Sequence, residues 1–206
     1  RTIFLTKLPD RVTYAQIFSV IRGGTVVDVW MKSSDHAASV SFVDCSAAEN
    51  FYQYTRKNDI YIDGKRIHVD WREPSRQFVI LNNIMSAISR GATRNLLLSK
   101  VPPSLTEARI REDLDHIHNL HVEKIEMKGS SILVNLNSVC VALFARTCLM
   151  SRSSYKGIRI EFTVDECAER LPAPKKMGIE RKKVQEKAIL KNRFDILAMA
   201  EDSEDE

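Results

Sequence analysis

The chain has 206 residues, of which 44% are hydrophobic and 28% are charged, and it contains only 7 Gly and 6 Pro. This balance is typical of a globular protein and excludes collagen-like, low-complexity and wholly disordered chains. The formal net charge of +4 is too small to indicate a nucleic-acid-binding protein by charge alone. No apolar run approaches the roughly 18 residues of a membrane-spanning helix, so we expect no membrane partner.

The four cysteines lie at wide and irregular spacing, at positions 45, 140, 148 and 167. This spacing fits neither a disulfide framework nor a zinc site, so we interpret them as reduced thiols of an intracellular protein. The chain begins without Met and without a signal-peptide pattern. We therefore expect a piece of a longer protein of the cytoplasm or nucleus.

The sequence repeats itself once, at an offset of slightly more than ninety residues. Residues 2–8, followed by Pro, resemble residues 95–101, also followed by Pro. Farther along, Ile-His-Val-Asp-Trp at 67–71 resembles Ile-Arg-Ile-Glu-Phe at 158–162. Offsets that drift by only a few residues indicate two copies of one structural unit.

Each copy predicts the order strand, helix, strand, strand, helix, strand. The expected N-cap of the first helix is Thr13 in the first copy and Ser104 or Thr106 in the second. The expected strands are 2–7, 25–32, 37–43 and 65–72 in the first copy, and 95–101, 121–128, 131–137 and 157–164 in the second. The second helices are expected at 45–57 and 138–150. This predicts an α+β protein with two ferredoxin-like βαββαβ domains in tandem.

The domain organisation follows from these elements. We expect a first domain at 1–73, a linker at 74–93, a second domain at 94–170 and an extension at 171–206. In the linker, an apolar stripe of Ile80, Ile84 and Ile88 predicts a short helix over about 79–89. We expect this helix to pack on a domain and to restrain the two domains relative to each other.

The extension has an uneven charge. Residues 175–193 carry eight bases and two acids, whereas residues 194–206 carry six acids and no base. Leu190, Phe194 and Leu197 recur at helical spacing and predict a C-terminal helix. Its apolar stripe covers either a surface of its own chain or a groove of a partner, and the charges touch a partner or simply remain solvated.

No catalytic motif is present in the sequence. There is no phosphate-binding glycine loop, no G-x-S-x-G and no H-E-x-x-H. His116, His118 and His121 are clustered, but they lack further ligands to complete a zinc site. We therefore predict no enzyme, no metal, no cofactor and no small-molecule substrate.

The order of elements resembles the RNA recognition motif (RRM), in which aromatic side chains on the first and third strands stack on bases. Residues 35–42 and 129–136 occupy the place of the third-strand signature. Small or aliphatic side chains, Ala37, Ser39, Ser131 and Leu133, stand where the stacking rings are expected. On the first strands Phe4 keeps its ring, whereas Leu97 does not.

Strand alternation predicts a reduced stacking surface in the first domain. Trp30 is expected beside Phe4, and His68, Asp70 and Arg72 on the same face, with Ile67, Val69 and Trp71 in the core. An alternative is that Trp30 packs under a linker or a partner. The predicted RNA-binding residues are Phe4, Thr6, Trp30, His68, Arg72, Arg76, Arg90, Arg94, Lys182 and Lys183.

Shorter motifs resemble fungal multi-RRM proteins of the "negative regulator of differentiation" type. These are residues 20–24 (Val-Ile-Arg-Gly-Gly), 71–75 (Trp-Arg-Glu-Pro-Ser), 91–95 (Gly-Ala-Thr-Arg-Asn) and 165–167 (Asp-Glu-Cys). The resemblance implies a non-enzymatic module that binds single-stranded RNA and regulates mRNA after transcription. The alternative is a protein-interaction scaffold of degenerate RRMs, with Leu97, Leu133, Leu190, Phe194 and Leu197 as the partner-binding residues.

Overall fold

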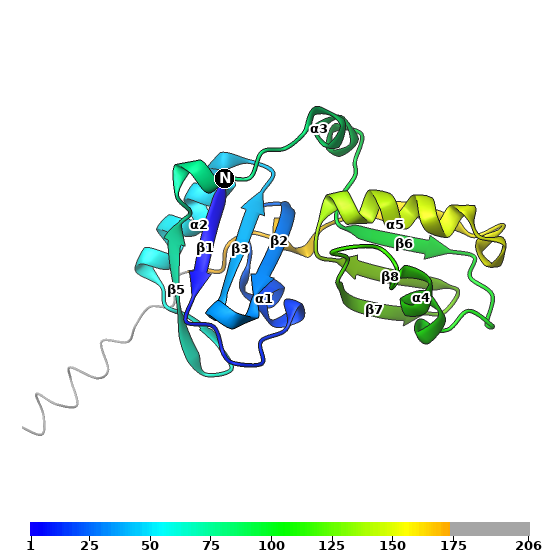
Figure 1. The fold of residues 1–206 in the computed structure, drawn as a ribbon, viewed down its shortest axis with the longest axis horizontal. Coiled ribbons are helices and arrows are strands. Elements are labelled where there is room, and N and C mark those ends of the chain that lie inside the picture. The colour runs from blue at the N-terminus through cyan, green and yellow to red at the C-terminus, as the bar shows by residue number, and fades with distance from the viewer. Residues whose placement is uncertain (174–206) are drawn as a thin grey trace, which may run out of the picture. The chain divides into compact units, whose positions relative to one another are not determined.

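The computed structural model describes residues 1–173. Residues 1–172 form one compact unit, which contains two antiparallel sheets with their helices (Figure 1). The predicted C-terminal helix lies outside the described residues, as do Lys182, Lys183, Leu190, Phe194 and Leu197. No helix of the described part has the length and apolar character required to cross a membrane.

The first domain has a five-stranded sheet in the order β2-β3-β1-β5-β4. Its strands are β1 (Thr2–Thr6), β2 (Val26–Lys32), β3 (Ala37–Phe42), β4 (Ile60–Ile62) and β5 (Lys65–Trp71). Its helices are α1 (Tyr14–Val20) and α2 (Cys45–Lys57), which pack on one face of the sheet. The bounds of α2 agree with the predicted helix at 45–57.

The N-terminus of α1 is closed by a capping box, as Thr13 predicts. The Thr13 Oγ1 accepts a hydrogen bond from the Gln16 backbone N–H at 3.3 Å, and Gln16 Oε1 accepts one from the Thr13 N–H at 2.9 Å. Two backbone donors that the helix itself leaves unpaired are thereby satisfied.

The strand β4 was not predicted. It forms a hairpin with β5, with Ile60 opposite Ile67 and Ile62 opposite Lys65. Between them, Asp63 and Gly64 both have positive φ, 48° and 73°, which suits a two-residue hairpin loop. The Asp-Gly pair after Ile-Tyr-Ile is the signal in the sequence that indicates this hairpin.

The second domain has a four-stranded sheet in the order β7-β8-β6-β9. Its strands are β6 (Asn95–Ser99), β7 (Val122–Lys128), β8 (Ser131–Leu136) and β9 (Arg159–Thr163). Its helices are α4 (Glu107–Leu114), with Thr106 as the N-cap, and α5 (Val139–Ser151). Both domains thus have the predicted α+β, βαββαβ arrangement, and each buries its own apolar core.

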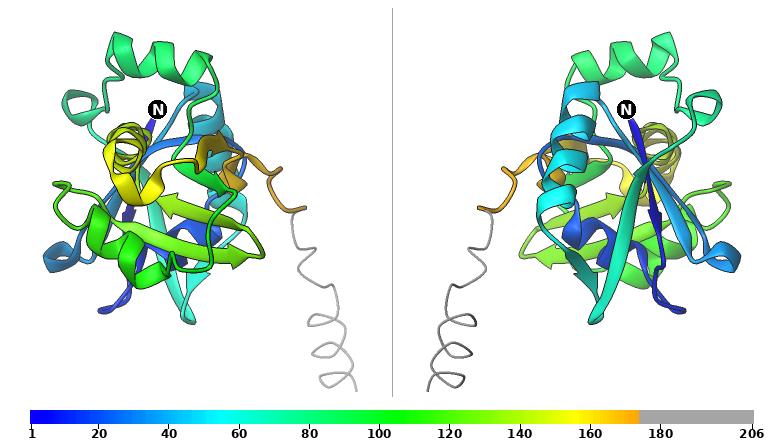
Figure 2. Two further views of the ribbon diagram at one scale, coloured as in Figure 1. Left: turned by 90° about the vertical axis from the view of Figure 1, so that its right-hand side faces the viewer. Right: turned by 90° about the vertical axis from the view of Figure 1, so that its left-hand side faces the viewer.

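The linker helix α3 (Asn82–Ser89) packs against both domains (Figures 1 and 2). Its buried Ile84 and Ala87 share a cluster with Val27 of the first domain and Val139 of the second. Ile80 and Ile88 pack against this cluster. The predicted apolar stripe therefore joins the two domains.

The segment that follows β9 returns to the first domain (Figure 2). The Gly24 N–H donates to the Cys167 carbonyl at 3.0 Å, and the Gly23 N–H donates to the Glu169 carbonyl at 2.7 Å. Cys167 is fully buried in the core of the first domain, and Leu171 packs against that core. Residues 165–171 thus connect the second domain to the core of the first.

Candidate nucleic-acid interface

The open face of the first sheet carries a row of side chains from four neighbouring strands. Trp30 is opposite Ser39, Ser39 is opposite Phe4, and Phe4 is opposite Asp70. Paired residues project to the same side of a sheet, and the neighbours of Phe4, Ile3 and Leu5, point into the core. The row therefore lies on the face away from the helices.

Two aromatic rings are available in this row. Trp30 is 46% exposed and Phe4 is half-buried. The strands β1 and β2 are separated by β3, so the two residues are roughly 10 Å apart. The small Ser39 lies between them and is nearly buried. The rings therefore present separate apolar surfaces on either side of a shallow floor.

Cationic and polar groups adjoin the Phe4 ring. The Arg72 guanidinium lies 5.3 Å from the ring centroid. Thr6 is opposite His68, and the Lys7 ammonium lies 3.3 Å from His68 Nε2. Lys7 was missed by sequence reasoning. It follows Thr6 directly at the end of β1, where its positive φ of 61° turns the chain.

The opposite end of this face is closed by the linker. Gln77 Oε1 accepts a hydrogen bond from the Thr2 N–H at 2.8 Å, and the Phe78 N–H donates to Thr2 Oγ1 at 2.9 Å. Thr2 and its neighbour Ser41 are consequently buried. The accessible part of the face is therefore the area around Trp30, Phe4 and His68.

Arg94 does not belong to this surface, and its assignment to the RNA contacts is wrong. The side chain is completely buried between the domains. Its guanidinium pairs with Asp165 at 3.0 Å, with Glu166 at 2.6 Å and with Glu123. It also lies 3.6 Å from the ring centroid of Phe18 in α1. A side chain with no exposed surface and three carboxylate partners cannot reach a ligand.

The same cluster extends into the first domain through Asp165. Its second oxygen, Oδ2, accepts a hydrogen bond from the Val26 N–H of β2 at 2.9 Å. Burial would lower the pKa of Arg94, but the surrounding carboxylates outweigh burial and raise it. Burial raises the pKa of Glu123 to about 7, and Arg94 opposes that rise. This cluster therefore has a structural role.

The two other predicted arginines of the linker are exposed. Arg76 pairs with Glu73 at 3.4 Å, and Arg90 lies at the C-terminal end of α3. Both remain accessible to a charged ligand.

Trp71 was expected in the core, and this prediction is wrong. Its ring lies on the helix side of the sheet, where it packs on Tyr52 of α2 at 5.3 Å between centroids. It is nevertheless 41% exposed, because it stands at the end of β5 and beyond the reach of the core residues. The first domain thus exposes one tryptophan on each face of its sheet.

The open face of the second sheet is aliphatic, with its charges internally paired. Leu97 is opposite Leu133, and both are half-buried. Glu126 pairs with Lys124 and Lys128, and Glu161 pairs with Arg159 at 2.6 Å. A groove of about 840 Å³ runs between this face and α1 of the first domain. The charged side chains of the second sheet's open face pair with one another, which distinguishes this face from the open face of the first sheet.

Two of the three clustered histidines contact neighbouring side chains, whereas His118 is exposed. His121 stacks on Tyr14 of α1, with 4.7 Å between ring centroids. His116 Nε2 lies 3.5 Å from the Cys148 thiol. Among residues 1–173, no group of three or more His, Cys, Asp or Glu side chains is placed to hold a metal ion.

Two curated fungal proteins are similar to this chain. It is 27% identical over 176 residues to RNA-binding protein MRN1 of Saccharomyces cerevisiae, covering 81% of this chain and 28% of that protein. It is 27% identical over 175 residues to Meiotically up-regulated gene 24 protein of Schizosaccharomyces pombe, covering 85% of this chain and 26% of that protein. The chain thus spans about a quarter of the length of these relatives.

The two domains have the strand order of the RRM fold, twice in tandem. No family model matches the sequence. Among solved structures, the N-terminal three RNA-binding domains of the yeast splicing factor Prp24 give a TM-score of 0.35 at 17% identity, covering 80% of this chain and 63% of that chain. The first two RRM domains of yeast Pub1 give 0.30 at 16%, covering 80% and 99%. Because these scores are low, the RRM fold is assigned from the strand order within each domain.

Proposed function

We propose that this tandem RRM protein binds single-stranded RNA through the open face of its first domain. The observation that carries the proposal is the pair of accessible rings, Trp30 and Phe4, on the face opposite the helices. RRM domains bind unstacked bases on aromatic side chains of this face. The similarity to a protein named as RNA-binding supports the same function.

Each of the predicted RNA-binding residues except Arg94 has a role in this proposal. Trp30 and Phe4 stack on separate bases, Arg72 lies at the edge of the base on Phe4, and Thr6 and His68 contact the sugar or the phosphate. Arg76 and Arg90 attract the phosphate backbone, as do Lys182 and Lys183 outside the described residues. The function requires no catalytic step.

The second RRM contributes differently in this proposal. Leu97 and Leu133 form an apolar pair whose neighbouring charges already have partners. Such a surface suits the side chains of a protein better than phosphates. We further propose that the protein regulates mRNA after transcription, in the cytoplasm or the nucleus.

The experiment compares the two tryptophans. Fluorescence anisotropy of labelled single-stranded RNA pools is measured with the full chain carrying Trp30→Ala or Trp71→Ala. Loss of a stacked base weakens binding by about 1–3 kcal/mol, so Trp30→Ala should weaken binding roughly tenfold or more. Trp71 is similarly exposed but lies on the helix side, so its replacement should leave RNA affinity unchanged.

Equal effects of the two replacements would contradict the assignment to this face. Failure of the wild-type chain to bind any pool at low salt would refute RNA binding and favour a protein-interaction scaffold.

A further inference from the structure

The two edges of the first sheet differ in what contacts them. The β2 edge contacts the second domain, where the Val29 N–H donates to the Asn137 carbonyl at 3.0 Å. At the other edge, β4 pairs only with residues 65–67 of β5. The chain enters β4 directly from α2, so β4 is too short to reach the rest of β5. Residues 68–71 therefore have β1 on one side and no strand of the described chain on the other.

The unpaired backbone groups of this edge can be identified. The Arg72 N–H donates to the Thr2 carbonyl of β1. In an antiparallel ladder the direction alternates from residue to residue, so His68 and Asp70 also bond to β1. The N–H and C=O groups of Val69 and Trp71 therefore point outward, away from β1.

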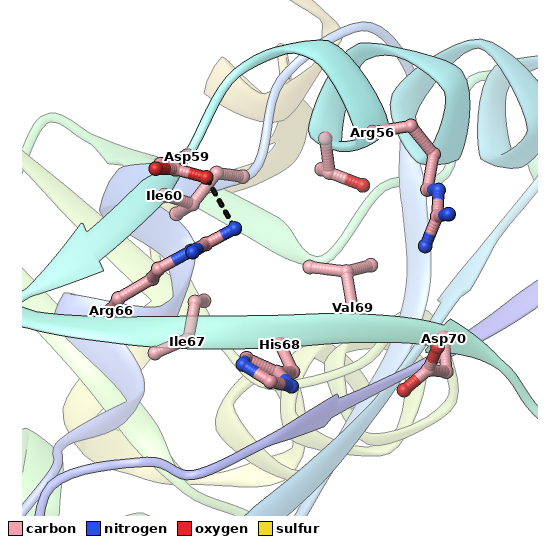
Figure 3. Close-up of a pocket in the computed structure, with 9 residues that line it drawn as sticks. Arg56, Asp59, Ile60, Arg66, Ile67, His68, Val69 and Asp70 are labelled. Atoms are coloured by element: carbon pink, nitrogen blue, oxygen red, sulfur yellow. Dashed lines mark ion pairs between the residues drawn. The ribbon is translucent and has the colours of Figure 1, made fainter.

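A pocket of about 280 Å³ lies beside this edge, where β4 would otherwise continue. In Figure 3, Arg56 of α2 and Arg66 of β5 stand on opposite sides of it, and Val69 lies between them. Arg66 pairs with Asp59 at 2.7 Å. Within the described residues, Arg56 has no ion pair or side-chain hydrogen bond. Asp70 also lines the pocket, but it belongs to the open face of the sheet beside Phe4. On the helix side of this edge, Arg56 is therefore the lining cation without a carboxylate partner among the described residues.

An apolar surface adjoins the same edge. Trp71 and Tyr52 pack together at the end of β5, and the indole remains 41% exposed. Large exposed apolar side chains that are grouped beside an unpaired strand mark a surface suited to a partner.

We propose that the outer edge of β5 is a docking site for an extended, acidic segment of a partner protein. The segment adds a strand beside Val69–Trp71, places a carboxylate against Arg56 and rests an apolar side chain on Trp71. Strand addition of this kind obtains affinity from backbone hydrogen bonds and specificity from flanking side chains. The site adjoins the proposed RNA surface at His68, which also lines the pocket, and it extends the function to a protein partner.

The choice of a peptide over RNA follows from the hydrogen-bonding groups. Val69 and Trp71 present alternating donors and acceptors, which a peptide backbone can match in register. The phosphate groups of RNA supply acceptors only, so they would leave the outward carbonyls unpaired. The acidic character follows from Arg56, whose charge has no partner within the described part of the chain.

The probe is a short labelled peptide of alternating valine and glutamate, titrated with the full chain and followed by fluorescence anisotropy. We expect Arg56→Glu to weaken binding by about tenfold, because attraction becomes repulsion at the same position. Lys57→Glu is the matched control, since Lys57 is the next residue of α2, is also exposed and does not line the pocket. It should change affinity by less than about twofold.

Two further peptides test the mode of binding. A peptide of alternating valine and lysine should bind at least several-fold more weakly, and so should the acidic peptide with N-methylated valines, which cannot donate to a strand. Backbone hydrogen exchange of Val69 and Trp71 should slow when the acidic peptide is added. Absence of binding, equal binding of the N-methylated peptide, or equal effects of Arg56→Glu and Lys57→Glu would each overturn the proposal.

Discussion

At the scale of single residues, Arg94 has the most demanding environment in the described structure. It holds three carboxylates, two of which follow β9, and it lies against Phe18 of the first domain. A planar guanidinium can bind several carboxylates and stack on a ring at once, which an ammonium cannot do. Arg94 therefore connects the two domains through one side chain.

Replacing Arg94 should destabilise the protein strongly. Arg94→Met removes the only cation of a buried cluster and leaves Glu123 and Asp165 without compensation, so we expect the free energy of unfolding to fall by about 3–5 kcal/mol. Chemical denaturation of the full chain measures this change. Arg90→Met, at an exposed position, is the control and should stay within about 0.5 kcal/mol of wild type. A change below about 1 kcal/mol for Arg94→Met would show that the cluster is solvated in solution.

The sequence could not reveal this role of Arg94. Its partners lie 29, 71 and 72 residues away, so no local pattern relates them. A single arginine next to a linker is compatible with either an RNA contact or a buried pair. The parity of Phe4, Trp30 and His68 was predictable, by contrast, because strand alternation is a local property.

At the scale of elements, the turn after α1 receives the segment 165–171. Gly23 has a φ of 96°, and a Cβ built there would lie 2.9 Å from Leu171 Cγ. Gly64, in the β4–β5 hairpin, has a φ of 73° with open space around it. The two glycines therefore share the backbone conformation and differ in their surroundings.

This difference gives a matched prediction. Gly64→Ala should cost about 1–2 kcal/mol of unfolding free energy, the penalty of an L-residue in the left-handed region. Gly23→Ala should cost this amount and roughly 1–3 kcal/mol more, because Leu171 must move. Thermal or denaturant unfolding of both variants tests the docking of the segment, and equal losses would mean that Leu171 does not pack there.

The elements themselves were largely predictable from periodicity and caps. The helix at 45–57, the Thr13 cap and the linker helix follow from local patterns, and the structure has them. The strand β4 has only three residues, too few for a periodic signal, and only its turn indicates it. The exposure of Trp71 depends on where β5 ends relative to α2, which local alternation does not determine.

At the scale of the whole molecule, the contact between the domains should depend on pH. Burial raises the pKa of Glu123 to about 7 and that of Asp28 to about 6, and both lie where the domains meet. At a pH between the unfolded and the folded pKa of these carboxyl groups, the unfolded chain binds fewer protons than the folded chain. The free energy of unfolding therefore falls as the pH rises through this range. Burial raises the pKa of Glu166, but Arg94 and the hydrogen bonds that Glu166 accepts outweigh burial and lower it. Glu166 therefore makes the free energy of unfolding rise with pH, and it does so at lower pH.

We therefore expect the unfolding free energy to decline from about pH 4 to about pH 7 through Glu123 and Asp28. Glu123→Gln removes one of these ionisations and should make the decline shallower by roughly 1–2 kcal/mol across that range. Denaturant unfolding at several pH values checks this. Glu161→Gln, in an exposed pair of the second sheet, should leave the slope unchanged. Parallel slopes for wild type and Glu123→Gln would contradict the assignment.

The return of residues 165–171 to the first domain has a consequence for synthesis on the ribosome. Val26 and its hydrogen-bond acceptor Asp165 are 139 residues apart in the chain, and Cys167 completes a core that begins at Ile3. At roughly 5–20 residues per second, translation takes about 7 to 28 seconds to cover that distance. Throughout this interval the emerging first domain has an incomplete core. It can reach its final packing only after the second domain has left the exit tunnel. The two sequence repeats therefore complete their folding together.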